Sequence, residues 1–192
     1  MVTASPSWHC QHCKKYINGH ELIFQAYQDG EALISDKTKR TVENYEKYVC
    51  QYESVLHPHH ICLVRIKYSL VGFYGRMPGY RWPQMAANPK LLERKLALGN
   101  EVLSVLEKTE PGISSSKGVI LYELHMPTFL LAQLNLNRGN IDAITAQKEL
   151  KQSIEYITAS IEHLKFNSKG SFGHQLYIAA QASLQHFQKW VQ

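Results

Sequence analysis

An apolar residue recurs every three or four positions along most of the chain, from about residue 38 onward, and no other feature constrains the fold as much. Two stripes of this kind run from Val42 to Leu56 and from Ile61 to Tyr74. Four more follow, in residues 91–106, 119–134, 150–164 and 172–191. A period near 3.6 residues is that of an α-helix with one buried face. The pattern therefore predicts an all-α protein with about six helices.

The predicted helices are joined by short loops, which makes successive helices antiparallel neighbours. The spacing between helix pairs is close to that of a tetratricopeptide array, although the signature residues of each repeat do not recur cleanly. We therefore expect a tetratricopeptide-like antiparallel helical bundle or solenoid, preceded by a short N-terminal hairpin. Residues 20–35 fit a short helix slightly better than a loosely paired strand.

Prolines, glycines and capping residues mark the ends of these helices. Asn88 is a natural N-cap ahead of Pro89, and the serines at 114–116 can cap the next helix. Residues 75–89 hold three prolines and two aromatic residues and are expected to form a loop. Pro127 lies inside the fourth helix and is expected to kink or split it, because proline lacks the N–H that would bond the carbonyl of Glu123.

Composition and charge narrow the classes of function. A hydrophobic content of 44% and a charged content of 19% are ordinary for a folded globular domain. The formal net charge is +5, but Arg94 and Lys95 stand beside Glu93 and near Glu101, as on a solvated helix face. Nucleic-acid binders instead concentrate their basic residues. We expect no nucleic-acid partner.

Neither a leader nor a membrane span is recognisable in the sequence. The first residues lack a basic region followed by an apolar run, and no apolar stretch is long enough to cross a bilayer. Four cysteines in 192 residues without a secretory leader indicate a reducing compartment. We expect a soluble intracellular protein, in the cytoplasm, the nucleus or both, with no membrane partner.

The segment WHCQHCKKYING, residues 8–19, contains the strongest local motif. Cys10 and Cys13 have the C-x-x-C spacing of a zinc knuckle, and a tight turn follows at Asn18. A structural zinc site needs four ligands, so these two residues predict half a site. Cys50 and Cys62 stand singly in helical stripes and are expected to act as small buried hydrophobes. A redox role fits less well, because thioredoxin-like motifs begin a helix in a βαβ setting.

Histidines are the other candidate residues. His57, His59 and His60 flank a proline before a helix, and we expect a loop and N-cap role for them rather than metal binding. His125 lies close to Pro127. It either donates to a carbonyl that the proline leaves without its partner or lines a groove for a partner, and the first role is favoured. No catalytic or cofactor-binding motif is present, so no residue is assigned to either role.

Several stretches taken together resemble the SET-and-MYND (SMYD) family of protein-lysine methyltransferases, specifically the arthropod SmydA/msta branch. The match covers almost the whole chain in the same order and at similar spacing. The residues that carry it are S-W-x-C-x-x-C at Ser7–Cys13, Y-x-S-V-L-H-P-x-H at Tyr52–His60, Y-G-R-M-P-G-Y at Tyr74–Tyr80, L-L-E-R-K at Leu91–Lys95 and Y-E-L-H-M-P at Tyr122–Pro127.

The resemblance implies that residues 1–36 are part of a post-SET zinc segment and that residues 37–192 are the C-terminal tetratricopeptide-like domain. In that family the SET domain binds S-adenosylmethionine, but its N-H-x-C signature has no counterpart here. The second half of the zinc site would then lie upstream of Met1. The expected function is a non-catalytic module that helps to shape a substrate cleft and binds a protein, a peptide or the family's own SET lobe.

Two alternatives stay open at this point. In the first, the chain is a fragment of an active S-adenosylmethionine-dependent protein (histone)-lysine methyltransferase whose SET domain lies outside this sequence. In the second, it is a stand-alone scaffold that depends on zinc.

Overall fold

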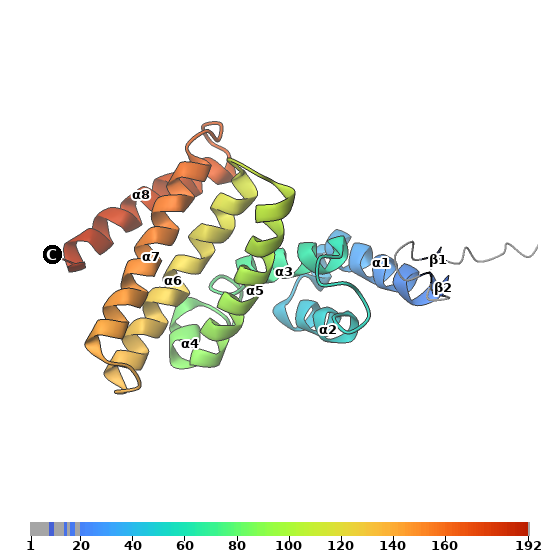
Figure 1. The fold of residues 1–192 in the computed structure, drawn as a ribbon, viewed down its shortest axis with the longest axis horizontal. Helices are drawn as coiled ribbons and strands as arrows, with labels where there is room; N and C mark the ends of the chain where they lie inside the picture. Colours follow the sequence, from blue (N-terminus) through green and yellow to red (C-terminus); the bar gives the residue numbers. More distant parts are fainter. Residues whose placement is uncertain (1–7, 10–13, 15, 18–19, 192) are drawn as a thin grey trace, which may run out of the picture. The chain divides into compact units, whose positions relative to one another are not determined.

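The computed structural model describes residues 8–9, 14, 16–17 and 20–191, and apart from one short pair of strands the elements within them are helical (Figure 1). The predicted fold class, an antiparallel helical bundle, is confirmed. The described residues form eight α-helices rather than about six. They are α1 (His20–Ser35), α2 (Val42–Tyr52), α3 (Ile61–Phe73), α4 (Trp82–Ala87), α5 (Pro89–Thr109), α6 (Ser115–Asn137), α7 (Ala143–Leu164) and α8 (Phe172–Val191).

Three smaller elements complete the description. Strands β1 (Trp8–His9) and β2 (Tyr16–Ile17) pair in antiparallel register, and a 3₁₀ helix, η1 (Lys37–Lys39), follows α1. Cys10 and Cys13 lie outside the described residues, so the predicted zinc knuckle stays a prediction.

The two additional helices have different origins. Residues 20–35 form α1, the favoured of the two alternatives for this segment. The expected loop at 75–89 is wrong for its second half, because residues 82–87 form α4. Arg81 is the extended N-cap of α4, and a proline in the first turn replaces an N–H that has no partner inside the helix. The prolines of this segment thus start helices as well as end them.

The chain divides into two compact units, Met1–Ile66 and Lys67–Gln192, with the boundary inside α3. The division at residue 36 came from the family resemblance and stays a prediction. In the first unit α1 packs on α2: the hydroxyl of Tyr48 donates to the carbonyl of Ala26 at 2.7 Å. Gly30 permits this contact, because a Cβ there would lie 2.9 Å from the Tyr48 hydroxyl.

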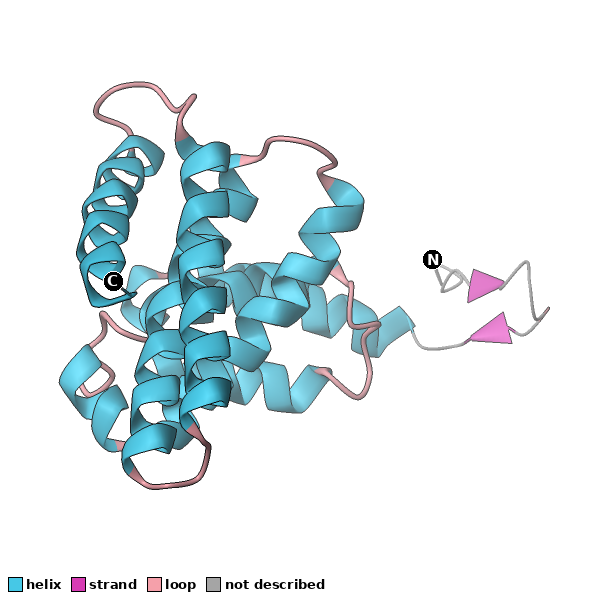
Figure 2. Cartoon of the chain, turned by 60° about the vertical axis from the view of Figure 1, so that its left-hand side comes forward, coloured by secondary structure: helices cyan, strands magenta, loops and turns pink. Residues whose placement is uncertain are grey.

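The second unit contains an array of antiparallel helices in which α6 packs between α5 and α7 and α8 follows α7 (Figure 1). Figure 2 shows long helices side by side, joined by loops. Its core includes two apolar clusters. One holds Val119, Leu164 and Leu176, and the other holds Ile157, Ala180 and Phe187. These residues come from α6, α7 and α8 and are spaced as the sequence stripes predict. Burial of their apolar surface is the main favourable contribution to folding of the array.

Of the caps predicted for α5 and α6, only that of α6 makes the expected bond: Ser114 accepts from the backbone N–H of Lys117. Asp142, which the sequence did not single out as a cap, accepts from the N–H of Thr145 at the start of α7. Asn88 occupies the N-cap of α5 but its side chain makes no capping bond. Pro127 does not split α6, which runs unbroken from residue 115 to 137. The helix tolerates it because neighbouring helices hold both halves of α6 in place.

Candidate functional site

The histidines predicted for a turn before α3 lie there. The ring Nδ1 of His57 accepts from the backbone N–H of His59 at 3.1 Å. That of His60 accepts from the N–H of Cys62 at 3.3 Å, which is an N-cap bond to the second residue of α3. The expected loop and N-cap role is confirmed. Of the two single cysteines, Cys62 is buried as predicted, but Cys50 is exposed and the prediction for it is wrong.

A different set of side chains, which the sequence did not single out, forms the strongest candidate site. At its centre Lys95 of α5 is fully buried and its Nζ has three acceptors. These are the carbonyl oxygens of Val71 at 2.9 Å and Tyr74 at 2.7 Å and the carboxylate of Glu123 at 2.6 Å. The sequence interpretation of Lys95 as part of a solvated face is wrong. Its position three residues from both Leu92 and Leu98, on the apolar stripe, was the available signal.

Burial lowers the pKa of Lys95, and the charge of Glu123 opposes this shift. The geometry is that of the charged ammonium form, because an ammonium has three N–H donors and here meets three acceptors. Glu123 also accepts from the guanidinium of Arg76. Two cations thus surround one carboxylate, and this cluster has one excess positive charge. Of the three residues only Arg76 reaches solvent, with 45% of its side chain exposed.

The loop before α4 builds the next wall of the site. Gly75 has φ +100°, and a Cβ there would lie 2.8 Å from the ring of Trp82. The N–H of Gly75 donates to the carbonyl of Tyr80 at 2.7 Å and closes the loop. The ring of Trp82 therefore packs on the glycine. The ammonium of Lys95 lies 4.9 Å from the centroid of this ring. This is within the range of a cation–π interaction.

His125 of α6 completes the polar part of the site. The side chain is buried, and its Nδ1 is bonded to the carbonyl oxygen of Tyr122. A carbonyl can only accept, so Nδ1 carries the proton. Nε2 is then an acceptor, and it has no partner among the described residues. Burial lowers the pKa of His125 to about 4, so the ring is neutral at pH 7. The predicted bond to a backbone carbonyl exists, but with residue 122 rather than 123.

Two hollows meet at the Arg76–Glu123 ion pair. The first, named here the polar cavity, has a volume of about 170 Å³ and is lined by Tyr74, Arg76, Trp82, Tyr122, Glu123, His125 and Met126. The second, the apolar groove, has a volume of about 310 Å³ and is lined by Tyr68, Ser69, Gly72, Phe73, Arg76, Val119, Ile120, Glu123 and Phe172. Because Arg76 and Glu123 line both, a ligand in one hollow lies next to the other.

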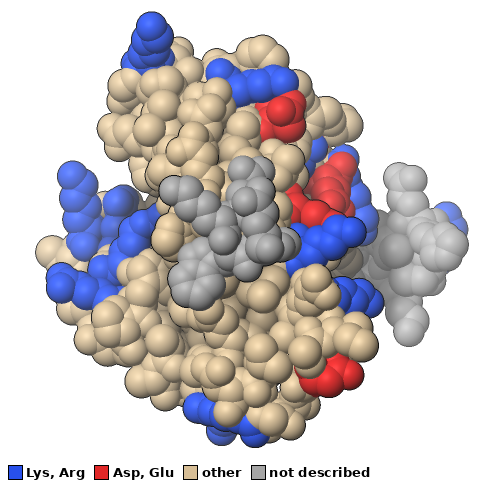
Figure 3. Space-filling view, turned by 90° about the vertical axis from the view of Figure 1, so that its left-hand side faces the viewer, with Lys and Arg blue, Asp and Glu red and all other residues tan. Residues whose placement is uncertain are grey.

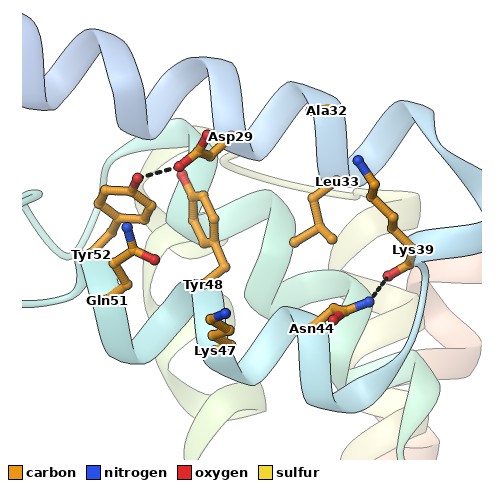
Figure 4. A pocket seen from close by; sticks show the side chains of 9 residues that line it. All are labelled: Asp29, Ala32, Leu33, Lys39, Asn44, Lys47, Tyr48, Gln51 and Tyr52. Atoms are coloured by element: carbon orange, nitrogen blue, oxygen red, sulfur yellow. Dashed lines mark hydrogen bonds between the residues drawn. The ribbon is translucent and has the colours of Figure 1, made fainter.

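A hollow of about 350 Å³ in the first unit lies between α1 and α2 (Figure 4). Two of its polar groups have partners in the same hollow. Tyr52 of α2 donates to the carboxylate of Asp29 of α1, and the side-chain amide of Asn44 donates to the carbonyl of Lys39 in η1 at 3.0 Å. Burial raises the pKa of Tyr52 to about 12, so it stays a neutral donor. The bond from Tyr52 to Asp29 helps to hold α1 and α2 together, and we regard the site in the second unit as the stronger candidate.

The described part of the chain shows neither a concentrated basic patch on the face in Figure 3 nor a cluster of metal-ligating side chains. On the face shown in Figure 3, basic side chains lie in separate small groups around a largely uncharged surface. Among the described residues no group of three or more His, Cys, Asp or Glu side chains could hold a metal ion. Within the same residues, no helix combines the length and the apolar character that crossing a membrane requires.

Comparison of the chain with protein-family models, with curated proteins and with solved structures finds no match in any of the three. The site therefore has to be interpreted from its own chemistry.

Proposed function

We propose that the chain is a non-catalytic interaction module that binds a segment of a protein or peptide partner in the apolar groove of the Lys67–Gln192 unit. The observation that carries this proposal is the groove itself, which combines apolar walls with a solvent-exposed guanidinium at one end. Grooves of this kind on helical proteins bind extended or helical segments through a few apolar side chains.

Exposed apolar side chains at the same end of the array support the proposal. Phe172, at the start of α8, lines the groove and is 58% exposed. Ile113 and Phe166, in the loops before α6 and after α7, are 60% and 70% exposed. The two loops lie together, because the N–H of Ser114 donates to Nδ1 of His163 at 3.1 Å. Exposed apolar side chains that gather beside a groove mark interaction surfaces.

The positive charge of Arg76 in the groove indicates which polar group a partner should have. The cluster of Lys95, Arg76 and Glu123 has one excess positive charge, and only Arg76 is in reach of a ligand. Among the described residues the guanidinium uses two of its five N–H donors, on Gly72 and Glu123. The remaining donors suit a carboxylate. The preferred segment therefore has an apolar side chain next to an Asp or Glu.

The family resemblance, if it holds, would place this surface in a larger protein. The partner would then be the protein's own SET lobe or a peptide substrate, and S-adenosylmethionine would bind to the SET domain rather than to these residues. The same resemblance underlies the alternative that the chain is part of an active lysine methyltransferase. The groove itself favours the interaction module, because most of its lining side chains are apolar, as in sites that bind apolar segments of a partner.

Fluorescence anisotropy with short synthetic peptides tests the proposal. Each peptide contains one Phe or Leu and one Glu at varied spacing in a Ser/Gly background. We expect saturable binding at one or two spacings and weaker binding when Glu is replaced by Gln. Phe172→Ser and Arg76→Gln should each weaken binding by about tenfold, the loss of one well-packed contact.

Matched controls are available for both variants. Ile144→Ser removes an apolar side chain that is 78% exposed at the first turn of α7, at the opposite end of the array from Phe172. Arg138→Gln removes an exposed arginine just after α6. Neither should change the affinity. Equal losses in control and test variants, or no saturable binding by any peptide, would refute the proposal.

A further inference from the structure

We propose that the polar cavity binds a planar carboxamide, whose N–H donates to Nε2 of His125 and whose oxygen accepts from the guanidinium of Arg76. This cavity adjoins the apolar groove at Arg76, and nothing in the proposed peptide binding requires His125. The inference starts from one atom: Nε2 of a buried histidine, with no partner among the described residues, on a ring that lines the cavity. A buried polar atom without a partner costs folding free energy, and ligand sites are where such a cost is found.

The form of the histidine fixes what can bind to it. With Nδ1 committed to the carbonyl of Tyr122, Nε2 presents a lone pair and no proton. A carboxylate cannot donate to this atom. A cationic ligand is disfavoured because Lys95 and Arg76 already place two positive charges around Glu123. The ligand must therefore be uncharged and must donate an N–H or O–H.

Arg76 supplies the opposite chemistry in the same cavity. Its guanidinium is a donor, so it needs an acceptor on the ligand. A primary carboxamide has an N–H donor and a carbonyl acceptor in one plane. That plane also suits the walls, because Tyr74, Trp82 and Tyr122 are aromatic and offer flat faces or edges to a planar group.

The size and lining of the cavity suit a small organic ligand that combines polar and apolar parts. The volume of about 170 Å³ is several times the share of one water in the liquid, ~30 Å³. Arg76, Glu123 and His125 supply polar groups, and three aromatic rings and Met126 supply apolar walls. A carboxamide on a small apolar body uses both the polar atoms and the apolar walls.

The carboxamide has two chemical sources: a free small amide, or the side chain of an Asn or Gln in a bound segment. Because Arg76 lies between the cavity and the groove, a segment in the groove could insert such a side chain. The two sources differ in size and in dependence on Phe172, which lines only the groove among these two hollows.

Nuclear magnetic resonance of the full chain labelled with ¹⁵N-histidine tests the inference directly. Benzamide is the first probe, with benzoate and N,N-dimethylbenzamide as matched controls that lack the N–H donor. We expect benzamide to move the Nε2 resonance of His125 upfield in a saturable manner, as hydrogen bonding to a bare ring nitrogen does. Neither control should move it. His125→Phe, checked for retained helical circular dichroism, should lose benzamide binding.

Peptides that differ only in Gln or Glu next to the apolar residue form the second arm. A response to benzamide alone assigns the site to free amides, and a response to the Gln peptide alone assigns it to a partner's side chain. No shift of Nε2 with either probe, or equal shifts with N,N-dimethylbenzamide, overturns the inference. Phe172→Ser should weaken the peptides and leave benzamide unaffected, so failure of the peptide proposal is distinguishable from failure of this one.

Discussion

At the scale of single residues, Lys95 has the greatest influence on the architecture of the second unit. Its ammonium joins the C-terminal end of α3, through the carbonyls of Val71 and Tyr74, to Glu123 on α6. Desolvating a charge in this way is costly unless every donor is paired. Here each of the three donors meets an acceptor. Lys95 therefore acts as a fixed spacer between three helices, and the same bonds orient Glu123 toward Arg76 in the site.

His125 predicts how stability should depend on pH. Burial lowers its pKa from 6.5 to about 4, whereas the Tyr122 carbonyl and Glu123 act in the opposite direction. The unfolded chain therefore binds more protons than the folded chain between these two values. The contribution of His125 to the free energy of unfolding is complete above pH 6.5 and is lost as the pH falls toward 4. The size of the pKa shift corresponds to a contribution of about 3 kcal/mol.

Urea unfolding at a series of pH values from 7.5 down to 4.5 measures this contribution by comparing the wild type with His125→Phe. The variant should lose less stability on acidification than the wild type. Burial also lowers the pKa of His163, but both proteins share that group and it cancels in the comparison. Parallel curves for the two proteins would show that His125 is not held in its neutral form.

At the scale of helices, the apolar stripes predicted elements well where one face is buried against a neighbour. Helices α2, α3, α5, α7 and α8 follow the stripes because burial of that face, rather than intrinsic propensity, stabilises them. Helix α4 was missed because Pro83 and the residues before it are typical of loops. Packing of Trp82 against Gly75 and burial of Met85 stabilise a helix there.

The candidate site was harder to predict than the helices for a related reason. Lys95 and Arg76 are both hydrogen-bonded to Glu123 but lie 28 and 47 positions before it in the sequence. Charged residues on helices are usually solvated, so each one taken alone indicates a surface position. Only the tertiary fold brings the three together. His125 was singled out from its closeness to Pro127, but its ring bonds the carbonyl of Tyr122 rather than the carbonyl of Glu123 that the proline leaves without its usual partner.

Two helical glycines offer a matched test of how tightly the helices pack. A Cβ on Gly118 of α6 would lie 2.7 Å from Leu164 of α7, which is closer than side chains tolerate. A Cβ on Gly72 of α3 would meet its nearest atom, on Arg76, at 3.6 Å, an ordinary contact. Gly118→Ala should therefore destabilise the protein by about 1–3 kcal/mol through overpacking. Gly72→Ala should stabilise it by about 0.5–1 kcal/mol through helix propensity.

Thermal or urea unfolding followed by circular dichroism measures both changes. Because both substitutions are Gly→Ala inside a helix, the difference between them isolates the helix–helix contact. Stabilisation by Gly118→Ala would mean that α6 and α7 are less closely packed than the structure shows.

At the scale of the whole molecule, the two compact units have separate means of stabilisation. In the first unit, tyrosine hydroxyls of α2 bond to α1, as Tyr48 does to Ala26. In the second unit, apolar clusters between α6, α7 and α8 stabilise the fold, and the buried ion pair of Lys95 and Glu123 links α5 to α6. Among the described residues neither unit contains a group of three metal ligands. Packing, hydrogen bonds and an ion pair join the helices within each unit.

This independence predicts the effect of removing metal. If Cys10 and Cys13 bind zinc, we expect the metal to stabilise the segment that carries its ligands more than the helices, because metal binding contributes to folding at its ligands. A strong chelator should leave the helical circular dichroism and the urea midpoint unchanged. The double variant Cys10→Ser/Cys13→Ser should match the chelated wild type in both measurements. Loss of helix on chelation in the wild type, but not in the variant, would show that the knuckle supports the helical units. The family resemblance to a zinc-containing protein would then gain physical support that the described residues do not themselves supply.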